Sequence, residues 1–258
     1  MKDKLTIIKV GGKIVEEPDS LARLLSDFSR IDGLKLLVHG GGRSATKMAA
    51  DLGIETTMIE GRRVTDNDML RVVAMVYGGL VNKTITARLQ GMGIDAIGMT
   101  GADMDIIRSH KRPAGKVDYG WVGDVDRVNG EALATLIRSG IVPVIAPLTH
   151  DGQGHLLNTN ADTMAGETAR GLADIFDVTL VYCFEKAGVL RDENDDDSVI
   201  PAIDPGLFEK LKADGIVTGG MLPKIENALK AVADGVKEVV ITQASSLDNL
   251  RKGTHIRL

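Results

Sequence analysis

The chain has 258 residues, of which 43% are hydrophobic, 26% are charged and only 3% are aromatic, and its formal net charge is -5. This balance predicts a soluble protein of one large α/β domain or two modest lobes, and it disfavours nucleic-acid binding through charge neutralisation or base stacking. The sequence has no apolar run of the ~18 residues that span a bilayer and no signal-peptide pattern, so we expect a cytoplasmic protein without a membrane partner.

Short apolar runs alternate with longer segments of helical spacing along the chain. The runs with strand character are Leu5–Val10, Leu34–His39, Ala96–Met99, Val142–Ala146, Thr179–Cys183 and Glu238–Thr242. The segments with helical spacing are Pro18–Ser29, Arg43–Asp51, Thr65–Gln90, Asp162–Leu172 and Pro223–Ala233. Strands that are apolar throughout are typical of sheets buried on both faces. The alternation therefore predicts a doubly wound, mostly parallel sheet between helix layers, with ligands beyond the carboxyl ends of its strands.

Some features stand apart from this alternation. Residues 101–130 are rich in Gly, Asp and Lys, which favours a hairpin over a core helix. The acidic run 192–197 is expected to be a solvated turn rather than a metal site, and a domain boundary is expected near 173–177.

The helix at 65–90 is expected to begin with Thr65 and Asp68 at capping spacing. The single cysteine, Cys183, is expected to pack as a small buried hydrophobe without a disulfide or zinc partner.

The first candidate site is the junction of a strand with two glycines, Lys9-Val10-Gly11-Gly12. Glycine lets the backbone approach an anion closely and offer it N–H groups, and a lysine at the strand end adds positive charge. The segment therefore indicates a phosphate site. It is equally compatible with a strand-end lysine that extends to solvent before an ordinary turn, and the segment alone does not decide between the two.

The next two candidates stand at a second strand end and just before a helix. Gly40–Gly42 follow His39, and three consecutive glycines cost chain entropy, which favours a close approach of the backbone to a ligand. For His39 itself we expect core packing or a local hydrogen bond. Arg62 and Arg63 follow Gly61, and an arginine fork there suits a carboxylate or a phosphate, with two solvated arginines as the alternative.

The remaining candidates lie in the second half of the chain. Asn158 and Asn160 are two residues apart, so on an extended segment they would point the same way and could bind a polar substrate. Asp162 stands where a helix begins, so N-capping explains it as well as a role in a site. Gly219 and Gly220 precede Lys224 at another helix start, which makes a second glycine-flanked lysine.

Together these segments supply two lysines, an arginine, two amides and one carboxylate. Phosphoryl transfer needs such positioning and charge neutralisation more than covalent chemistry. The sequence has no G-x-x-x-x-G-K-[ST] loop, which excludes a Walker-type ATPase, and no H-R-D catalytic loop. A G-x-G-x-x-A match at 91–96 follows a helix and precedes a strand, the reverse of the dinucleotide-binding arrangement.

The order of these segments resembles the amino-acid kinase superfamily, and within it the enzymes that phosphorylate N-acetyl-L-glutamate in arginine biosynthesis. The resemblance rests on Ile8–Gly12, His39–Gly42, Gly61–Thr65, Asn158–Asp162 and Gly219–Lys224, together with Trp121–Val125, which resembles that family's substrate-side hairpin. It runs from about residue 5 to the C-terminus. It implies the amino-acid kinase fold, a three-layer αβα sandwich with a mostly parallel central sheet.

The resemblance also implies roles for parts of the chain. An N-terminal lobe, residues 1–174, would bind the N-acyl-L-glutamate and form a homodimer, and a C-terminal lobe, residues 175–258, would bind ATP, which carries the Mg²⁺. The implied catalytic residues are Lys9, Lys224 and Asp162, with Asp162 holding both lysines. The implied ATP-binding residues are Gly11, Gly12, Glu185, Gly219 and Gly220. The implied substrate-binding residues are Gly41, Gly42, Arg63, Asn158 and Asn160, and no residue is implied to bind a metal directly.

Two segments depart from the family's usual pattern. Phe184-Glu185-Lys186 stands where the family has Thr-Asp-Val, so Glu185 would replace an aspartate. Arg62 is an extra cation that could meet the second carboxylate of a succinyl group, which leaves N-succinyl-L-glutamate as an alternative acceptor. Carbamate, aspartate, glutamate and UMP are further candidate acceptors, and a ligand sensor without activity is a candidate from another functional class. Only four residues precede the first predicted strand, without room for the N-terminal helix of arginine-inhibited relatives, so we expect a dimer that arginine does not inhibit.

Overall fold

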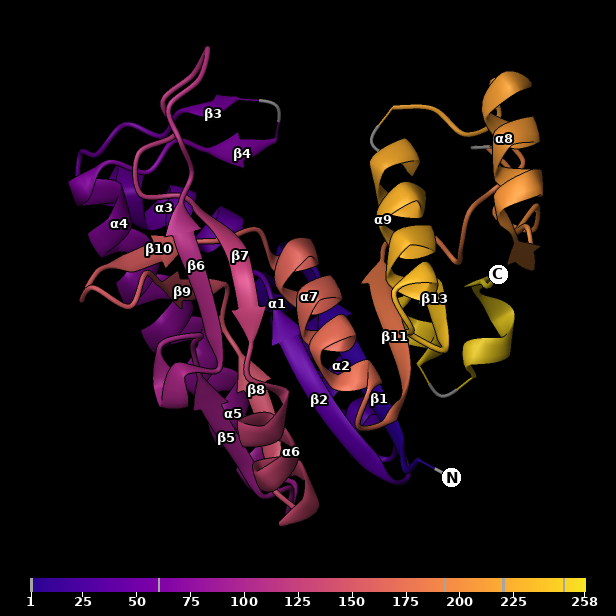
Figure 1. The fold of residues 1–258 in the computed structure, drawn as a ribbon, viewed down its shortest axis with the longest axis horizontal. Coiled ribbons are helices and arrows are strands. Elements are labelled where there is room, and N and C mark those ends of the chain that lie inside the picture. Colours follow the sequence, from indigo (N-terminus) through magenta and orange to yellow (C-terminus); the bar gives the residue numbers. More distant parts are fainter. Residues whose placement is uncertain (1, 60, 193, 220, 248) are drawn as a thin grey trace.

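The computed structural model describes residues 2–59, 61–192, 194–219, 221–247 and 249–258. Its centre is an eight-stranded sheet in the order β12-β14-β13-β11-β1-β2-β8-β5 (Figure 1). These strands are β1 (Lys4–Val10), β2 (Leu34–His39), β5 (Ala96–Met99), β8 (Val142–Ile145), β11 (Asp177–Phe184), β12 (Ala202–Ile203), β13 (Glu238–Gln243) and β14 (Thr254–Ile256). Paired strands are parallel except β13 and β14, which are antiparallel. The mostly parallel sheet predicted from the apolar runs is confirmed.

Helices cover both faces of this sheet. One layer consists of α6 (Gly130–Arg138), α7 (Ala161–Ala173), α8 (Pro205–Ala213) and α9 (Met221–Ala233), and α6, α7 and α9 lie in front of the sheet in Figure 1. The other layer consists of α1 (Gly12–Glu16), α2 (Pro18–Ser29), α3 (Gly42–Asp51), α4 (Asn67–Val73), the π-helical segment η1 (Ala74–Val81) and α5 (Asn82–Gln90). Short 3₁₀ segments occur at η2 (Asp103–Asp105), η3 (Ala244–Ser246) and η4 (Leu250–Lys252). The predicted three-layer αβα sandwich is confirmed.

Strand β1 shows why these residues form a central strand. Leu5 and Ile7 belong to the core on the α7 side, whereas Ile8 and Val10 belong to the core on the α2 side, and all four are 0% exposed. Side chains alternate between the faces of a strand, so a strand with apolar residues at both odd and even positions is buried on both faces. Lys9 follows Leu5 and Ile7 in this alternation and therefore points to the α7 side.

Two smaller sheets lie beside the central one. The first has the order β10-β9-β6-β7 and contains β6 (Ile107–Lys111), β7 (Gly123–Val128), β9 (Leu148–His150) and β10 (Leu156–Asn158). The second pairs β3 (Met58–Ile59) with β4 (Arg62–Arg63). Strands β6 and β7 are antiparallel, so the hairpin predicted for 101–130 is confirmed. These sheets matter for the site because β10 ends at Asn158 and β4 carries Arg63.

Three details of the predicted helices are wrong. The helix predicted from Thr65 begins at Asn67, and its N-cap is Asp66, whose carboxylate accepts from the Met69 N–H at 2.8 Å. The helix predicted from Asp162 begins one residue earlier, with Asn160 as its N-cap, so capping does not explain Asp162. Helices α6 and α8 were not predicted; both follow segments rich in turn residues, and each is only nine residues long.

Strand β11 begins at Asp177, just after the predicted boundary near residue 175, and pairs directly with β1. The predicted boundary between the two lobes therefore lies within one continuous sheet. The division into two lobes stays a prediction. Cys183 on β11 is 0% exposed, as predicted for a buried small hydrophobe, and burial raises the pKa of its thiol to about 12. Within the described ranges, no helix has both the length and the apolar character needed to cross a membrane.

Candidate functional site

The carboxyl ends of three neighbouring strands, β11, β1 and β2, open onto two cavities. The first cavity, about 220 Å³, is lined by Lys9, Gly40–Gly42, Arg62–Arg63, Tyr77, Val122, Pro147 and Asn158–Asp162, among others. The second, about 600 Å³, is lined by Gly11–Ile14, Arg43, Thr46, Cys183–Lys186, Met221 and Lys224, among others. Gly12, Gly42, Met58 and Arg63 line both. The cavities therefore adjoin where doubly wound sheets bind ligands.

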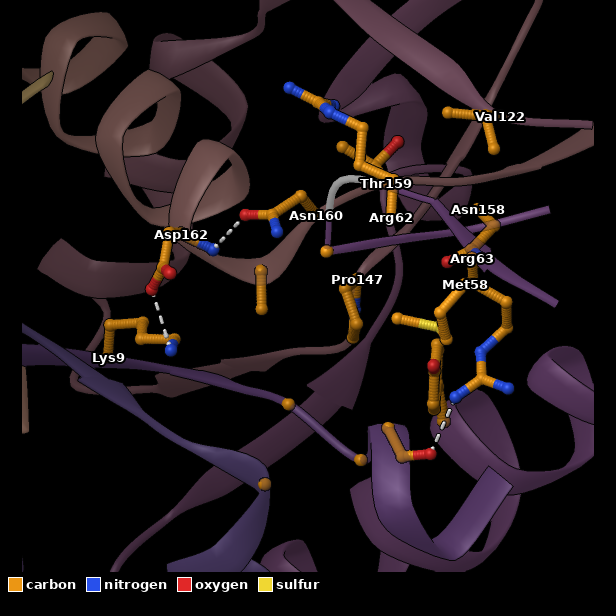
Figure 2. Close-up of a pocket in the computed structure, with 17 residues that line it drawn as sticks. Lys9, Met58, Arg62, Arg63, Val122, Pro147, Asn158, Thr159, Asn160 and Asp162 are labelled. Atoms are coloured by element: carbon orange, nitrogen blue, oxygen red, sulfur yellow. Dashed lines mark hydrogen bonds and ion pairs between the residues drawn. The ribbon is translucent and has the colours of Figure 1, made fainter. Parts of the chain in front are cut away.

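Lys9 and Asp162 meet at one side of the first cavity, as Figure 2 shows. The Lys9 ammonium is 2.6 Å from the Asp162 carboxylate, and Lys9 is only 6% exposed, so it is not a strand-end lysine that extends to solvent. Lys9 pairs in register with Tyr182 of β11, whose hydroxyl donates to the Asp162 carbonyl at 3.2 Å. The pair therefore joins β1, β11 and the first turn of α7.

Lys224, on the first turn of α9, reaches the same region from the second cavity. Its ammonium lies 3.8 Å from the centre of the Phe184 ring, and the Lys9 ammonium lies 5.5 Å from the same ring. Burial lowers the pKa of Lys224, and the Asp162 carboxylate opposes this shift. The structure thus brings Lys9, Asp162 and Lys224 together, although the ion pair of Asp162 is with Lys9 alone among the described residues.

Arg63 lies on the opposite side of the first cavity from Lys9 and Asp162 (Figure 2). It is 7% exposed, and its Nη2 donates to the Gly42 carbonyl at 2.8 Å and to the Thr46 hydroxyl at 2.9 Å. These bonds fix a buried positive charge beside the first residues of α3. A fixed positive charge at this place favours binding of an anion such as a carboxylate in the first cavity.

The glycine loop between these charges is packed closely on its surroundings. A Cβ on Gly41 would lie 2.9 Å from Cδ1 of Tyr77, and one on Gly12 would lie 3.4 Å from the Gly42 nitrogen. A side chain at Gly41 would therefore displace the Tyr77 ring. The glycines keep the loop thin enough for its N–H groups to reach a ligand in the first cavity.

Both predicted asparagines line the first cavity, but their side-chain amides make different hydrogen bonds. Asn158 donates from Nδ2 to the Thr65 hydroxyl at 2.9 Å, and that hydroxyl donates to the Arg63 carbonyl at 3.0 Å. Asn160 uses its Oδ1 to accept from the N–H groups of Asp162 and Thr163, at 2.8 and 3.1 Å. Asn160 therefore sets the start of α7, which carries Asp162.

His39 and Asn82 form a buried network beneath the glycine loop. The His39 Nδ1 is 2.8 Å from the Gly40 carbonyl, and the Asn82 amide nitrogen is 3.1 Å from His39 Nε2 and 2.9 Å from the Val144 carbonyl. Because carbonyls only accept, Nδ1 carries the proton and Nε2 accepts from Asn82. Full burial lowers the pKa of His39 to about 4, so the ring is neutral at pH 7. The local hydrogen bond expected for His39 is confirmed.

Sequence reasoning missed Asn82 and Tyr77. Asn82 lies between Val81 and Ile85 on the apolar face of the predicted helix, and a polar residue at such a position was an available signal. Tyr77 is 5% exposed beneath Gly41, and burial raises the pKa of its phenol, which therefore stays neutral. The sequence holds no signal for Tyr77 beyond a rare aromatic side chain among aliphatic ones.

The rim of the second cavity carries further charges. Glu185 forms an ion pair with Lys13 at 2.9 Å, and the hydrogen bond from Lys13 lowers the pKa of Glu185. Lys186 forms an ion pair with Asp196 at 2.7 Å. Gly219 lines neither cavity, and Gly220 lies outside the described residues. In the described part of the chain, no cluster of three or more His, Cys, Asp or Glu side chains is arranged to hold a metal ion.

The chain is similar to known proteins both in sequence and in fold. The model of the amino acid kinase family matches residues 4–243. The chain is 67% identical over 257 residues to acetylglutamate kinase of Phocaeicola vulgatus and 64% identical over 257 residues to acetylglutamate kinase of Bacteroides thetaiotaomicron, with 100% of both chains covered in each case. Among solved structures, the crystal structure of smu.665 from Streptococcus mutans UA159 is 28% identical, with a TM-score of 0.76 and 98% of each chain covered.

Proposed function

Since the chain belongs to the amino acid kinase family, and its relatives of 63–67% identity are acetylglutamate kinases, we propose that it phosphorylates the γ-carboxylate of N-acetyl-L-glutamate with ATP in arginine biosynthesis. The products are an acyl phosphate and ADP. The observation that carries this proposal is the convergence of Lys9, Asp162 and Lys224: Asp162 binds Lys9, both ammonium groups lie over the Phe184 ring, and Asp162 and Lys224 line one further cavity. A phosphoryl group in transfer is stabilised by such fixed positive charges.

The first cavity suits the acyl amino acid. Its volume, about 220 Å³, is that of a small molecule, and Arg63 can bind one carboxylate while the other points toward Lys9. The N–H groups of Gly41 and Gly42, at the start of the ten-residue helix α3, add a favourable site for a carboxylate. Asn158 and Asn160 border the same space and complete the proposed contacts.

The second cavity suits the nucleotide. Gly11 and Gly12 face it with Lys224, and Glu185 lies at its rim. An adjacent cavity of about 320 Å³, lined by Val189, Leu190, Ile216 and Val217, among others, offers an apolar slot for a base. Mg²⁺ would enter on the ATP phosphates as part of the substrate. Because ATP is supplied inside cells, the proposed reaction belongs in the cytoplasm.

The proposed mechanism is a direct transfer. An oxygen of the γ-carboxylate attacks the γ-phosphorus, the bond from that phosphorus to the β–γ bridging oxygen breaks, and ADP leaves with the electron pair. A carboxylate is already ionised at pH 7, so no general base is required. Lys9 and Lys224 stabilise charge on the group in transfer, and Asp162 orients Lys9.

A specific observation favours a second acceptor, N-succinyl-L-glutamate. Arg62 lines the first cavity beside Arg63 and supplies a further cation for the additional carboxylate of a succinyl group. We test both acceptors by incubating the protein with MgATP, hydroxylamine and either N-acetyl-, N-succinyl- or free L-glutamate, and measuring the hydroxamate formed. The proposal predicts hydroxamate from an acylated glutamate and far less from glutamate itself. Hydroxamate from none of the three would overturn it.

We also propose a homodimer. Met75 and Leu80 on η1 and Ile97 on β5 are 54%, 57% and 38% exposed, and β5 is the last strand of the central sheet. Exposed apolar side chains beside an open sheet edge favour association with another copy. Light scattering should give twice the mass of one chain, and the double variant Met75→Glu, Leu80→Glu should shift the protein toward monomer. A monomeric parent protein would contradict the proposal.

A further inference from the structure

Lys9 and Lys224 reach the same region but are held in different ways. The Lys9 ammonium is bound by the Asp162 carboxylate at 2.6 Å. Among the ion pairs of the described residues, none includes Lys224. Its ammonium instead lies over the Phe184 ring, 3.8 Å from the centre. This distance is well within the ~6 Å at which a cation is attracted to the face of an aromatic ring.

The Phe184 ring is itself fixed by the sheet. Phe184 and Tyr182 are two residues apart on β11, so they point to the same face, and their rings are stacked with centres 6.0 Å apart and planes 11° apart. The Tyr182 hydroxyl donates to the Asp162 carbonyl. One chain of contacts thus joins Asp162, Tyr182, Phe184 and Lys224.

The Phe184 ring lies near both lysines. Phe184 lines the second cavity and also a cavity of about 310 Å³ that contains Asp162 and Lys224. The Lys9 ammonium is 5.5 Å from the ring centre, so the electron-rich face of one ring lies within range of both positive charges. The ring attracts the Lys224 ammonium without neutralising it, whereas a directly paired carboxylate, such as Asp162 beside Lys9, cancels part of the positive charge.

We propose that Phe184 is a positioning residue for the reaction: the face of its ring holds the Lys224 ammonium close to Lys9 and Asp162. This inference rests on the proposed function for its kinetic consequence only. The contact favours an ammonium in a partly buried place and restricts the rotamers of a flexible side chain. The ring therefore lowers the barrier to phosphoryl transfer through its effect on Lys224.

The first test separates ring electronics from packing. Phe184 is replaced in turn by its 4-fluoro, 3,5-difluoro and 3,4,5-trifluoro analogues, which weaken the negative ring face with little change of size. We expect kcat to fall stepwise, in total about two- to thirtyfold, with the KM for the acyl acceptor changed less than about twofold. Phe184→Tyr should retain most of kcat, and Phe184→Leu should lower it. A kcat that does not respond to fluorination would overturn the inference.

The matched control is the same fluorinated series at Phe208. This residue lies on α8, lines neither cavity, and its ring is 5.8 Å from the ammonium of Lys212. We expect unchanged kcat across that series. A fall equal to that at Phe184 would show a general effect of fluorination and would remove the kinetic support.

A second measurement does not depend on activity. In protein labelled with ¹³C at the lysine ε position, the Phe184 ring should shift the Lys224 signal upfield. That shifted signal should disappear in both Lys224→Arg and Phe184→Leu. A Lys224 signal at the ordinary lysine position would overturn the inference even if the enzyme is active. An inactive parent protein with the shifted signal would overturn the proposed function and leave the contact established.

Discussion

The Lys9 ammonium and the Asp162 carboxylate lie 2.6 Å apart and join the end of β1 to the first turn of α7. Lys9 is the buried member, with 8% of its side chain exposed, whereas 31% of the Asp162 side chain is exposed. The carboxylate therefore contacts both the lysine and the first cavity. Its charge sets where the Lys9 ammonium points.

Asp162→Asn leaves Lys9 charged and without its anion. We expect kcat to fall strongly, and the free energy of unfolding to fall by about 1–3 kcal/mol, less than for a fully buried pair because Asp162 is partly exposed. Urea denaturation and steady-state kinetics measure the two effects. Glu226→Gln, which removes the exposed partner of Lys212, is the control and should change both by little. Equal effects in the two variants would contradict the role of Asp162.

Lys9→Ala and Lys224→Ala should each lower kcat by about 10²–10³ with a much smaller change in either KM, because their charges matter most in the transition state. Lys230→Ala, an exposed lysine on the same helix as Lys224, is the control and should retain parental kcat. Kinetics at saturating MgATP separate kcat from KM. A near-parental kcat in either site variant removes that lysine from the mechanism.

Arg63→Lys keeps the charge but loses the planar fork that bonds the Gly42 carbonyl and the Thr46 hydroxyl. We expect the KM for the acyl acceptor to rise about 10- to 100-fold with little effect on the KM for ATP. Arg23→Lys on the exposed face of α2 should change neither constant. An unchanged acceptor KM in Arg63→Lys would show that this guanidinium does not bind the substrate.

Gly41→Ala places a methyl group 2.9 Å from Cδ1 of Tyr77. The displaced loop or ring should raise the acceptor KM about tenfold, since overpacking costs about 1–3 kcal/mol. Tyr77→Leu removes the clash, so the double variant should have a lower acceptor KM than Gly41→Ala alone. The single Tyr77→Leu variant supplies the reference for the cycle. A double variant no better than Gly41→Ala would show that the clash is not the cause.

His39 predicts how stability depends on pH. Its pKa is about 4 in the folded protein and near 6.5 when unfolded, so below pH 6.5 the unfolded chain binds a proton that the folded protein does not. Stability is therefore lost as the pH falls from 6.5 toward 4, by about 2 kcal/mol between pH 7 and pH 5. Denaturation curves at both values measure this loss. His39→Gln should show a flatter dependence, and an equally steep one would assign the loss to other groups.

Much of the fold could be predicted from the sequence because its central strands carry apolar side chains on both faces. Leu34–His39 and Ala96–Met99 have the same bounds in prediction and structure. The first residues of helices were harder to predict, because Thr65 and Asp66 both suit an N-cap. Only the fold shows that Asp66 is the N-cap and that the Thr65 hydroxyl accepts a hydrogen bond from Asn158. Local sequence does not decide between such neighbours.

The site residues that lie at or just after the end of an apolar strand could be predicted from the sequence. Lys9 and the glycines of the first cavity are of this kind. The Phe184–Lys224 contact was not predictable, because it depends on how α9 packs beside β11. The same holds for Tyr77 and Asn82, whose roles arise from the contact of η1 and α5 with the glycine loop and the sheet.

Mass spectrometry of the hydroxamate formed from N-acetyl-L-glutamate, MgATP and hydroxylamine shows which carboxylate the protein phosphorylates. Fragmentation locates the hydroxamate on the γ- or the α-carboxyl carbon. With Arg63 binding one carboxylate and Lys9 close to the other, we expect the γ-hydroxamate, formed with one ADP per molecule and lost in Lys9→Ala. No hydroxamate, or one on the α-carboxyl group, would contradict phosphorylation of the γ-carboxylate at this site.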